Sequence, residues 1–147
     1  MLDQLKTIQD AASVAVAERD RTLLNQAAES LIVLLQQSRR TLQQRYGQFR
    51  SISLGASFKY PQWDDKLDSE ILDDLRNGIV IDEAANELLS GQMKNASSAV
   101  RKRLAQEAKT NKIYLRGLAN RARRVLEQRG TWTDAFAQEF WKYLTHY

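Results

Sequence analysis

The chain has 147 residues, a formal net charge of +4, one proline, six glycines and no cysteine. This length fits one domain with a single core, and the missing cysteine excludes a disulfide framework and a thiolate metal site. No apolar run approaches the roughly 20 residues that span a membrane, and the N-terminus lacks a signal-peptide core, so a cytoplasmic location is expected. Few prolines and glycines favour long helices over a fold with many turns.

The first 46 residues are predicted to be helical throughout. Apolar side chains recur at helical spacing in residues 2–17, and in residues 21–46 they step by four and three, as in a helix packed lengthwise on a neighbour. Asp10 or Asp20 would cap a second helix, and Gly47 would end it. Because no glycine or proline separates the two segments, one bent helix and two helices both fit.

A cluster of arginines lies near the end of this segment, at Arg39, Arg40 and Arg45. Cations at the C-terminus of a helix complement its dipole, which stabilises the helix by roughly 0.3–1 kcal/mol for each exposed cation. The alternative interpretation is a patch of phosphate contacts, secondary to the basic stretch described below.

Residues 48–67 are predicted to be an aromatic connection between helices, with Phe49, Phe58, Tyr60 and Trp63. The rings either pin a loop to the core or offer a platform for a base or a partner protein, since base stacking contributes about 1–3 kcal/mol per base.

Two short acidic helices are predicted next, in residues 68–77 and 82–90. Asp68 or Ser69 would cap the first and Asp82 the second, while Gly78 and Gly91 would end them. Acids lie in the first turn of each, where the helix dipole favours negative charge.

The basic stretch in residues 92–129 is the most informative part of the chain, with 11 Lys or Arg against 2 Glu. Read as a helix, it carries one apolar stripe and a neighbouring row of cations. The apolar stripe comprises Val100, Leu104, Ala108, Leu115, Leu118, Ala122 and Val125, with Asn111 as its polar member. A break at Thr110–Asn111 would divide this helix into two. One face is therefore expected to be buried while the cations stay exposed.

The chain closes with a predicted aromatic helix. Gly130 would end the basic stretch, and Thr131 with Asp134 would form a capping box. The rings that follow recur at helical spacing and are typical of a core or of a subunit contact. Residues 1–147 are thus predicted to form an all-α, single-domain helical bundle of five to seven helices.

Nothing in the sequence indicates catalysis, a metal or a cofactor. His146, the only histidine, precedes the last residue, and the six glycines stand singly, without a phosphate-binding loop. Asp64–Asp65 and Asp73–Asp74 are adjacent carboxylates that point in different directions on a helix, so solvated faces explain them better than Mg²⁺ ligation.

The excess positive charge predicts nucleic-acid binding, because phosphates relieve the repulsion between neighbouring cations. The competing partner is an acidic protein surface, such as residues 64–87 of a neighbouring copy, with a formal charge of −7. A membrane surface fits less well, since the apolar face is rich in alanine. The predicted phosphate contacts are Arg101, Lys102, Lys109, Lys112, Arg116, Arg121, Arg123 and Arg124, with Arg39, Arg40 and Arg45 as the second patch.

Two other functions stay open. Residues 81–106 contain a helix, a glycine and a second helix, which suggests a helix-turn-helix regulator of DNA, although the linker Gly91–Asn95 is longer than the usual turn. The other alternative is a protein–protein adaptor without affinity for nucleic acid.

In general character the whole chain resembles the small subunits of CRISPR Cascade effector complexes. The segments that carry the resemblance are RKRLAQEAKTNKIYLRGLANRARRVL and the closing DAFAQEFWKYL. The resemblance implies an all-helical subunit without enzymatic activity. It also implies a place in a ribonucleoprotein built on guide RNA, beside other subunits and copies of itself, with contacts to the backbone of the target or displaced DNA strand.

Overall fold

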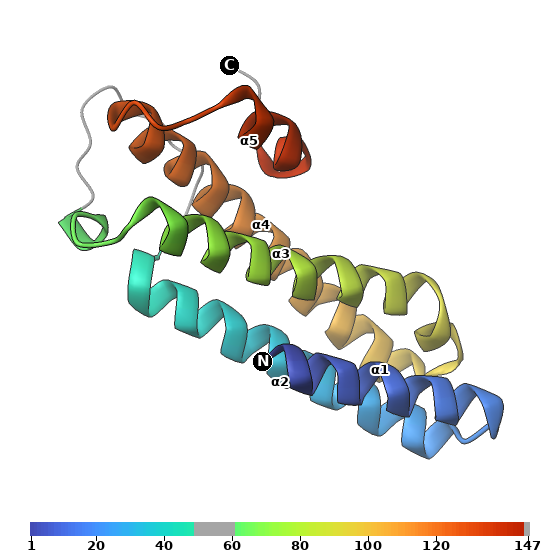
Figure 1. Cartoon of the computed structure of the whole chain (residues 1–147). Helices are drawn as coiled ribbons and strands as arrows, with labels where there is room; N and C mark the ends of the chain where they lie inside the picture. The colour runs from blue at the N-terminus through green and yellow to red at the C-terminus, as the bar shows by residue number, and fades with distance from the viewer. Residues whose placement is uncertain (49–60, 146–147) are drawn as a thin grey trace.

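The computed structural model describes residues 1–48 and 61–145, and these form an all-α domain without β-strands (Figure 1). The main helices are α1 (Leu2–Ala17), α2 (Arg21–Tyr46), α3 (Asp68–Ser90) and α4 (Ser98–Gln128). A short helix α5 (Asp134–Glu139) and three 3₁₀ turns complete the chain: η1 (Pro61–Trp63), η2 (Gln92–Asn95) and η3 (Trp141–Tyr143). The predicted fold class is confirmed.

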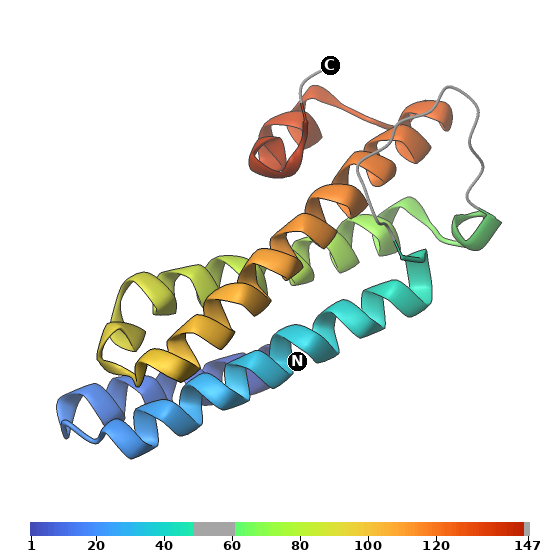
Figure 2. The same cartoon turned by 180° about the vertical axis from the view of Figure 1, so that it is seen from behind.

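The four main helices run alternately up and down, so α2 and α4 are parallel neighbours (Figures 1 and 2). The contacts between them follow this parallel register: Asn25 meets Ser97, and ten to fourteen residues further along Gln36 and Arg39 meet Glu107. The helix α1 pairs with the first part of α2 only. The second part of α2 is covered by α3 and by η1.

The hydrophobic core consists of two clusters. The first joins α1 and η2 with the first part of α2, the end of α3 and the start of α4. The second joins the end of α2, the start of α3 and the second half of α4 with Trp63, Phe140 and Tyr143. The boundary crosses the three long helices at Ser38, Gly78 and Asn111, which are all buried and either polar or small. Within the second cluster, Trp63 is also held by a hydrogen bond, since its indole N–H donates to the Tyr46 carbonyl at 3.1 Å.

The first 46 residues form two helices. α1 ends at Ala17, and Arg19 takes a left-handed conformation with φ of 54°, which reverses the chain. Asp20 caps α2 by accepting a hydrogen bond from the Leu23 amide at 3.0 Å, as one of the sequence alternatives expected. Gly47, with φ of 94°, ends α2.

The prediction of two short acidic helices was wrong, because α3 is continuous through Gly78. A side chain at this position would meet Leu115 Cδ2 at 2.9 Å and Leu42 Cδ1 at 3.1 Å. The glycine therefore lets three helices approach closely rather than ending one. Asp82, which was expected to be a helix cap, lies inside α3 and is fully buried.

Two further details of the C-terminal half differ from the sequence prediction. The helix α4 passes through Thr110–Asn111 without a break, since Asn111 is buried against α3, where its amide donates to Asp82. The predicted closing helix is divided at Phe140 into α5 and η3, and Thr133 rather than Thr131 caps α5. Of the predicted aromatic connection, Phe49, Phe58 and Tyr60 lie outside the described residues.

Candidate nucleic-acid interface

The helix α4 presents a row of cations because its opposite face is anchored. Every member of the predicted apolar stripe is buried, Asn111 included, between α2 and α3. Lys102, Lys109 and Arg116 are exposed and follow one another at intervals of seven residues. Seven residues advance a helix by about 10.5 Å and rotate it by nearly two full turns, so these three cations lie along one line. We call this row the α4 ridge.

Two further exposed residues lie beside the α4 ridge, one apolar and one cationic. Ile113 lies between Lys109 and Arg116 and is 49% exposed, which gives the row an apolar contact point. Arg101, at the start of α4, is exposed, and its Nε donates to the Ala96 carbonyl at 3.0 Å. None of these four cations has an ion pair with an acid in the part of the chain that the structure describes. They are free to meet an anionic partner.

The second predicted patch is mostly neutralised within the molecule. Arg39 pairs with Glu107 of α4, and its side chain is only 15% exposed. Arg45 bonds to Asp74 at 2.8 Å and to Glu70 at 3.1 Å, both on α3. Arg40 is the exposed member of the patch. The structure therefore does not bring Arg39, Arg40 and Arg45 together as a common anion site.

Lys112 belongs to a buried polar junction instead of the ridge. Its ammonium group lies 3.0 Å from Asp82 Oδ2 and 5.2 Å from the centre of the Tyr143 ring. The Asp82 carboxylate, which has no exposed surface, also accepts hydrogen bonds from Tyr143 Oη at 2.7 Å and from Asn111 Nδ2 at 3.3 Å. Burial raises the pKa of the Tyr143 phenol, and its bond to Asp82 raises it further. Lys112 thus compensates a buried charge.

The remaining predicted cations lie in the second half of α4. Arg121 is buried, and its Nη1 donates to the Gly117 carbonyl at 3.2 Å. Arg123 is 29% exposed and bonds to Glu127 one turn further on. Arg124 is half-buried. Only Arg101, Lys102, Lys109 and Arg116 of the eight main residues are both exposed and without an acidic partner among the described residues.

The C-terminal segment is attached to α4 and α3 by polar contacts. Asn120, fully buried on α4, accepts from the Thr145 amide at 3.1 Å, and its side-chain amide donates to the Tyr143 carbonyl at 3.3 Å. Arg76 of α3 bonds to Glu139 through two nitrogens. The segment therefore lies across the second half of α4. The sequence pattern placed Asp82 at a helix cap and gave no role to Asn120 or Glu139, and only the polar Asn111 within the apolar stripe indicated a buried polar junction.

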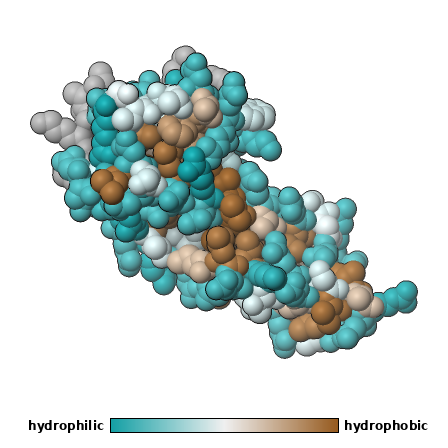
Figure 3. All heavy atoms as spheres, viewed as in Figure 1, coloured by the Kyte–Doolittle hydropathy of each residue, from teal (hydrophilic) through white to brown (hydrophobic). Residues whose placement is uncertain are grey.

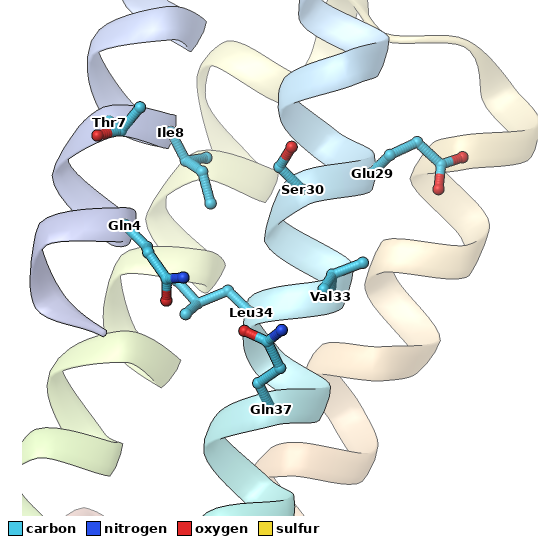
Figure 4. A pocket seen from close by; sticks show the side chains of 8 residues that line it. All are labelled: Gln4, Thr7, Ile8, Glu29, Ser30, Val33, Leu34 and Gln37. Atoms are coloured by element: carbon cyan, nitrogen blue, oxygen red, sulfur yellow. The ribbon is translucent and has the colours of Figure 1, made fainter.

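A groove of about 450 Å³ lies between α1 and α2, where Gln4, Thr7, Ser30 and Gln37 surround Ile8, Val33 and Leu34 (Figure 4). In the face drawn in Figure 1, apolar patches are scattered among hydrophilic residues (Figure 3). Among the described residues, no three His, Cys, Asp or Glu side chains gather closely enough to hold a metal ion.

The described helices include none that is long and apolar enough to cross a bilayer. Comparisons with protein-family models, with curated proteins and with solved structures found no match to this chain.

Proposed function

We propose that the protein binds nucleic acid without catalysing a reaction, through phosphate contacts along the α4 ridge. The observation that carries the proposal is the line of Lys102, Lys109 and Arg116, exposed and unpaired with acids in the described structure, on a helix whose other face is buried. A row about 21 Å long spans several phosphates of a nucleic-acid strand. Such contacts carry little sequence information, so binding should be largely independent of sequence.

The α4 ridge supports this function better than the helix-turn-helix alternative. A recognition helix inserts its N-terminal residues into the major groove. In this protein the N-terminal end of α4 is bonded to α2, since Asn25 Oδ1 accepts from the Ser97 amide at 2.8 Å and Asn25 Nδ2 donates to Ser97 Oγ at 2.7 Å. The cations of α4 also run along its length instead of gathering at its start.

We further propose that the protein acts as a subunit of a larger ribonucleoprotein, similar to the small subunit of CRISPR Cascade complexes. The supporting features are the all-helical fold and the α4 ridge. A subunit of this kind would contact the target or displaced strand and would lie beside other subunits or copies of itself. Copurification from the native host, followed by sequencing of bound RNA and identification of bound proteins, tests this part.

The binding proposal is tested by fluorescence anisotropy with a labelled 30-nucleotide strand and a 30-base-pair duplex, titrated at several KCl concentrations. Lys102→Gln/Lys109→Gln should weaken binding roughly tenfold and reduce the slope of log K against log salt by about 1.4 for the single strand and 1.8 for the duplex. The matched control, Lys6→Gln/Lys142→Gln, removes the same charge from exposed positions elsewhere.

Equal losses in the two double variants would show non-specific attraction and would contradict a defined interface. Melting temperatures should be unchanged in both, because the four lysines are exposed. An unmodified protein that binds neither oligonucleotide in 50 mM salt would refute the proposal and favour the adaptor alternative.

A further inference from the structure

Four cations from four consecutive or neighbouring segments lie at one end of the bundle. Arg19 lies in the turn after α1, Arg21 begins α2, Lys94 belongs to η2, and Arg101 lies in the first turn of α4. The α1–α2 turn and η2 occupy the same end of the molecule in both views (Figures 1 and 2). We call these four residues the basic corner. Of these four, only Arg101 was among the predicted site residues.

Hydrogen bonds hold two members of the basic corner in place. Arg21 Nε donates to the Asn95 carbonyl at 3.1 Å, which ties the start of α2 to η2. Arg101 Nε donates to the Ala96 carbonyl, which turns this guanidinium back toward η2. Both arginines keep their remaining N–H groups for a ligand, since each guanidinium carries five donors.

A hollow of about 340 Å³ lies at the basic corner, with Arg19, Arg21 and Asn95 among its lining residues. Two acids are close in the sequence, Glu18 and Asp20. Asp20 also lines the hollow, but its Oδ1 is engaged as the cap of α2. Four cations against two acids leave a formal charge of +2 at the basic corner.

The conformation of Arg19 is a second sign that its side chain has a use. Its φ of 54° lies in the left-handed region, which favours glycine or asparagine over a long side chain. A glycine would make this turn with less strain. The arginine at this position is one of the residues that line the hollow.

The N-terminal end of α4 adds to the positive potential at the basic corner. The side chain of its N-cap, Ser97, makes no capping bond to the first turn, because its hydroxyl accepts from Asn25. The first amides of α4 are thus without a side-chain cap, and the positive end of the helix dipole adds to the charges of Lys94 and Arg101.

We infer that the basic corner binds backbone phosphates of the same nucleic acid and continues the α4 ridge around the end of the bundle. This inference rests on the proposed function, the binding of nucleic acid. Lys102 is the link between the two surfaces, since it follows Arg101 directly in the chain. The bound strand would pass along α4 and then turn toward Arg19 and Lys94.

The test compares salt slopes on a labelled thymidine 30-mer for four proteins: the unmodified chain, a corner variant (Arg19→Gly/Lys94→Gln), the ridge variant Lys102→Gln/Lys109→Gln, and their combination. Two lost phosphate contacts should reduce the slope by about 1.4 in the corner variant and by about twice that in the combination. The melting temperature of the corner variant should not fall, since glycine relaxes the turn. Arg19→Asn/Lys94→Gln repeats the test with a residue that keeps chain stiffness and accepts this φ.

The outcomes separate the two proposals. A corner variant with the slope of the unmodified protein, beside a weakened ridge variant, overturns the basic corner alone. A weakened corner variant beside an unaffected ridge variant supports the basic corner and overturns the α4 ridge. No binding by the unmodified protein overturns both, and the stepwise loss of slope supports both.

Discussion

The cations of α4 fall into two groups, one exposed to solvent and one engaged within the molecule, and the two groups lie mainly in different halves of the helix. In the first half, Arg101, Lys102 and Lys109 extend into solvent, and even Arg103, which bonds to Glu29, is 60% exposed. From the middle of the helix onward most cations are engaged, since Lys112 compensates the buried Asp82 and Arg121 is itself buried, while Arg116 stays exposed. Beyond the helix end, Arg129 bonds to Asp68 and to the Trp63 and Lys66 carbonyls.

The difference lies in the partners that the cations find. From Lys112 onward, several cations bond to acids or carbonyls within the molecule: Lys112 to Asp82, Arg121 to the Gly117 carbonyl and Arg123 to Glu127. The first half packs on α2 and on the end of α3, and Arg101, Lys102 and Lys109 on its other side stay exposed. A count of positive charge along the sequence therefore overstates the surface offered to an anionic ligand.

The largest expected effect is the loss of stability in Lys112→Met. Removing the ammonium leaves Asp82 as a fully buried charge without a cation, which should lower the free energy of unfolding by about 3–5 kcal/mol. The control Lys109→Met, one turn earlier and exposed, should change it by no more than about 0.5 kcal/mol. Urea unfolding measures both. Equal stabilities would mean that Lys112 is a surface lysine like its neighbour.

A second comparison is between glutamine variants of Arg121 and Arg116, in stability and in nucleic-acid affinity. Arg121→Gln should lower the free energy of unfolding by about 2–3 kcal/mol, because a buried charge-assisted hydrogen bond is lost, and should leave nucleic-acid affinity unchanged. Arg116→Gln should do the reverse and weaken binding at constant stability. Anisotropy titrations and urea unfolding on both proteins decide the matter. A reversed pattern would place the interface at Arg121 instead of on the α4 ridge.

A third, smaller effect is expected for Tyr143→Phe. The variant removes the hydroxyl that donates to the buried Asp82, at a cost of about 1.5–2 kcal/mol in unfolding free energy. Tyr114→Phe is the matched control, since Tyr114 donates to the neutral Gly47 carbonyl at 2.8 Å and should cost about 1 kcal/mol. Thermal and urea unfolding measure the difference, and a larger loss in the control would argue against the importance of the polar junction.

The smallest effect concerns pH. The hydrogen bonds from Arg76 hold the pKa of Glu139 below its ordinary 4.5. The ionised carboxylate thus stabilises the fold above pH 4.5, and the contribution is lost as pH falls through the lowered pKa of the folded state. Glu139→Gln should be less stable than the unmodified protein at pH 7, and the difference should shrink below pH 4. Arg76→Gln should show the same trend, and a difference that is constant with pH would exclude this pair as its source.

The spacing of apolar residues along the sequence was enough to predict the helices that pack on the core. The spacing of apolar residues placed the buried stripe of α4 correctly from Val100 to Val125, and Asp20 and Gly47 marked the limits of α2. Each of these features depends on neighbours within a few residues in the chain. The wrong prediction at Gly78 shows the limit of local pattern. Gly78 is a glycine because Leu42 and Leu115 approach it closely, and those residues are far away in the sequence.

The candidate site was only partly predictable for the same reason. Exposure of Lys102 and Lys109 follows from the helical period alone. The partners of Arg39, Lys112 and Arg129 lie 30 to 68 residues away, at Glu107, Asp82 and Asp68. The same separation hid the basic corner, whose members come together only after α1 and α2 have formed a hairpin beside η2.

The division of the core at Ser38, Gly78 and Asn111 has a consequence for dynamics. Each end of the molecule has its own apolar cluster, and the two share only the three long helices and the junction around Asp82. Such a chain favours sub-global opening, in which one end loosens while the other stays folded. Backbone amides near the junction around Asp82 would then exchange with solvent most slowly. A nucleic-acid strand bound along the first half of α4 would slow exchange chiefly at the end of the molecule that holds the α1–α2 turn.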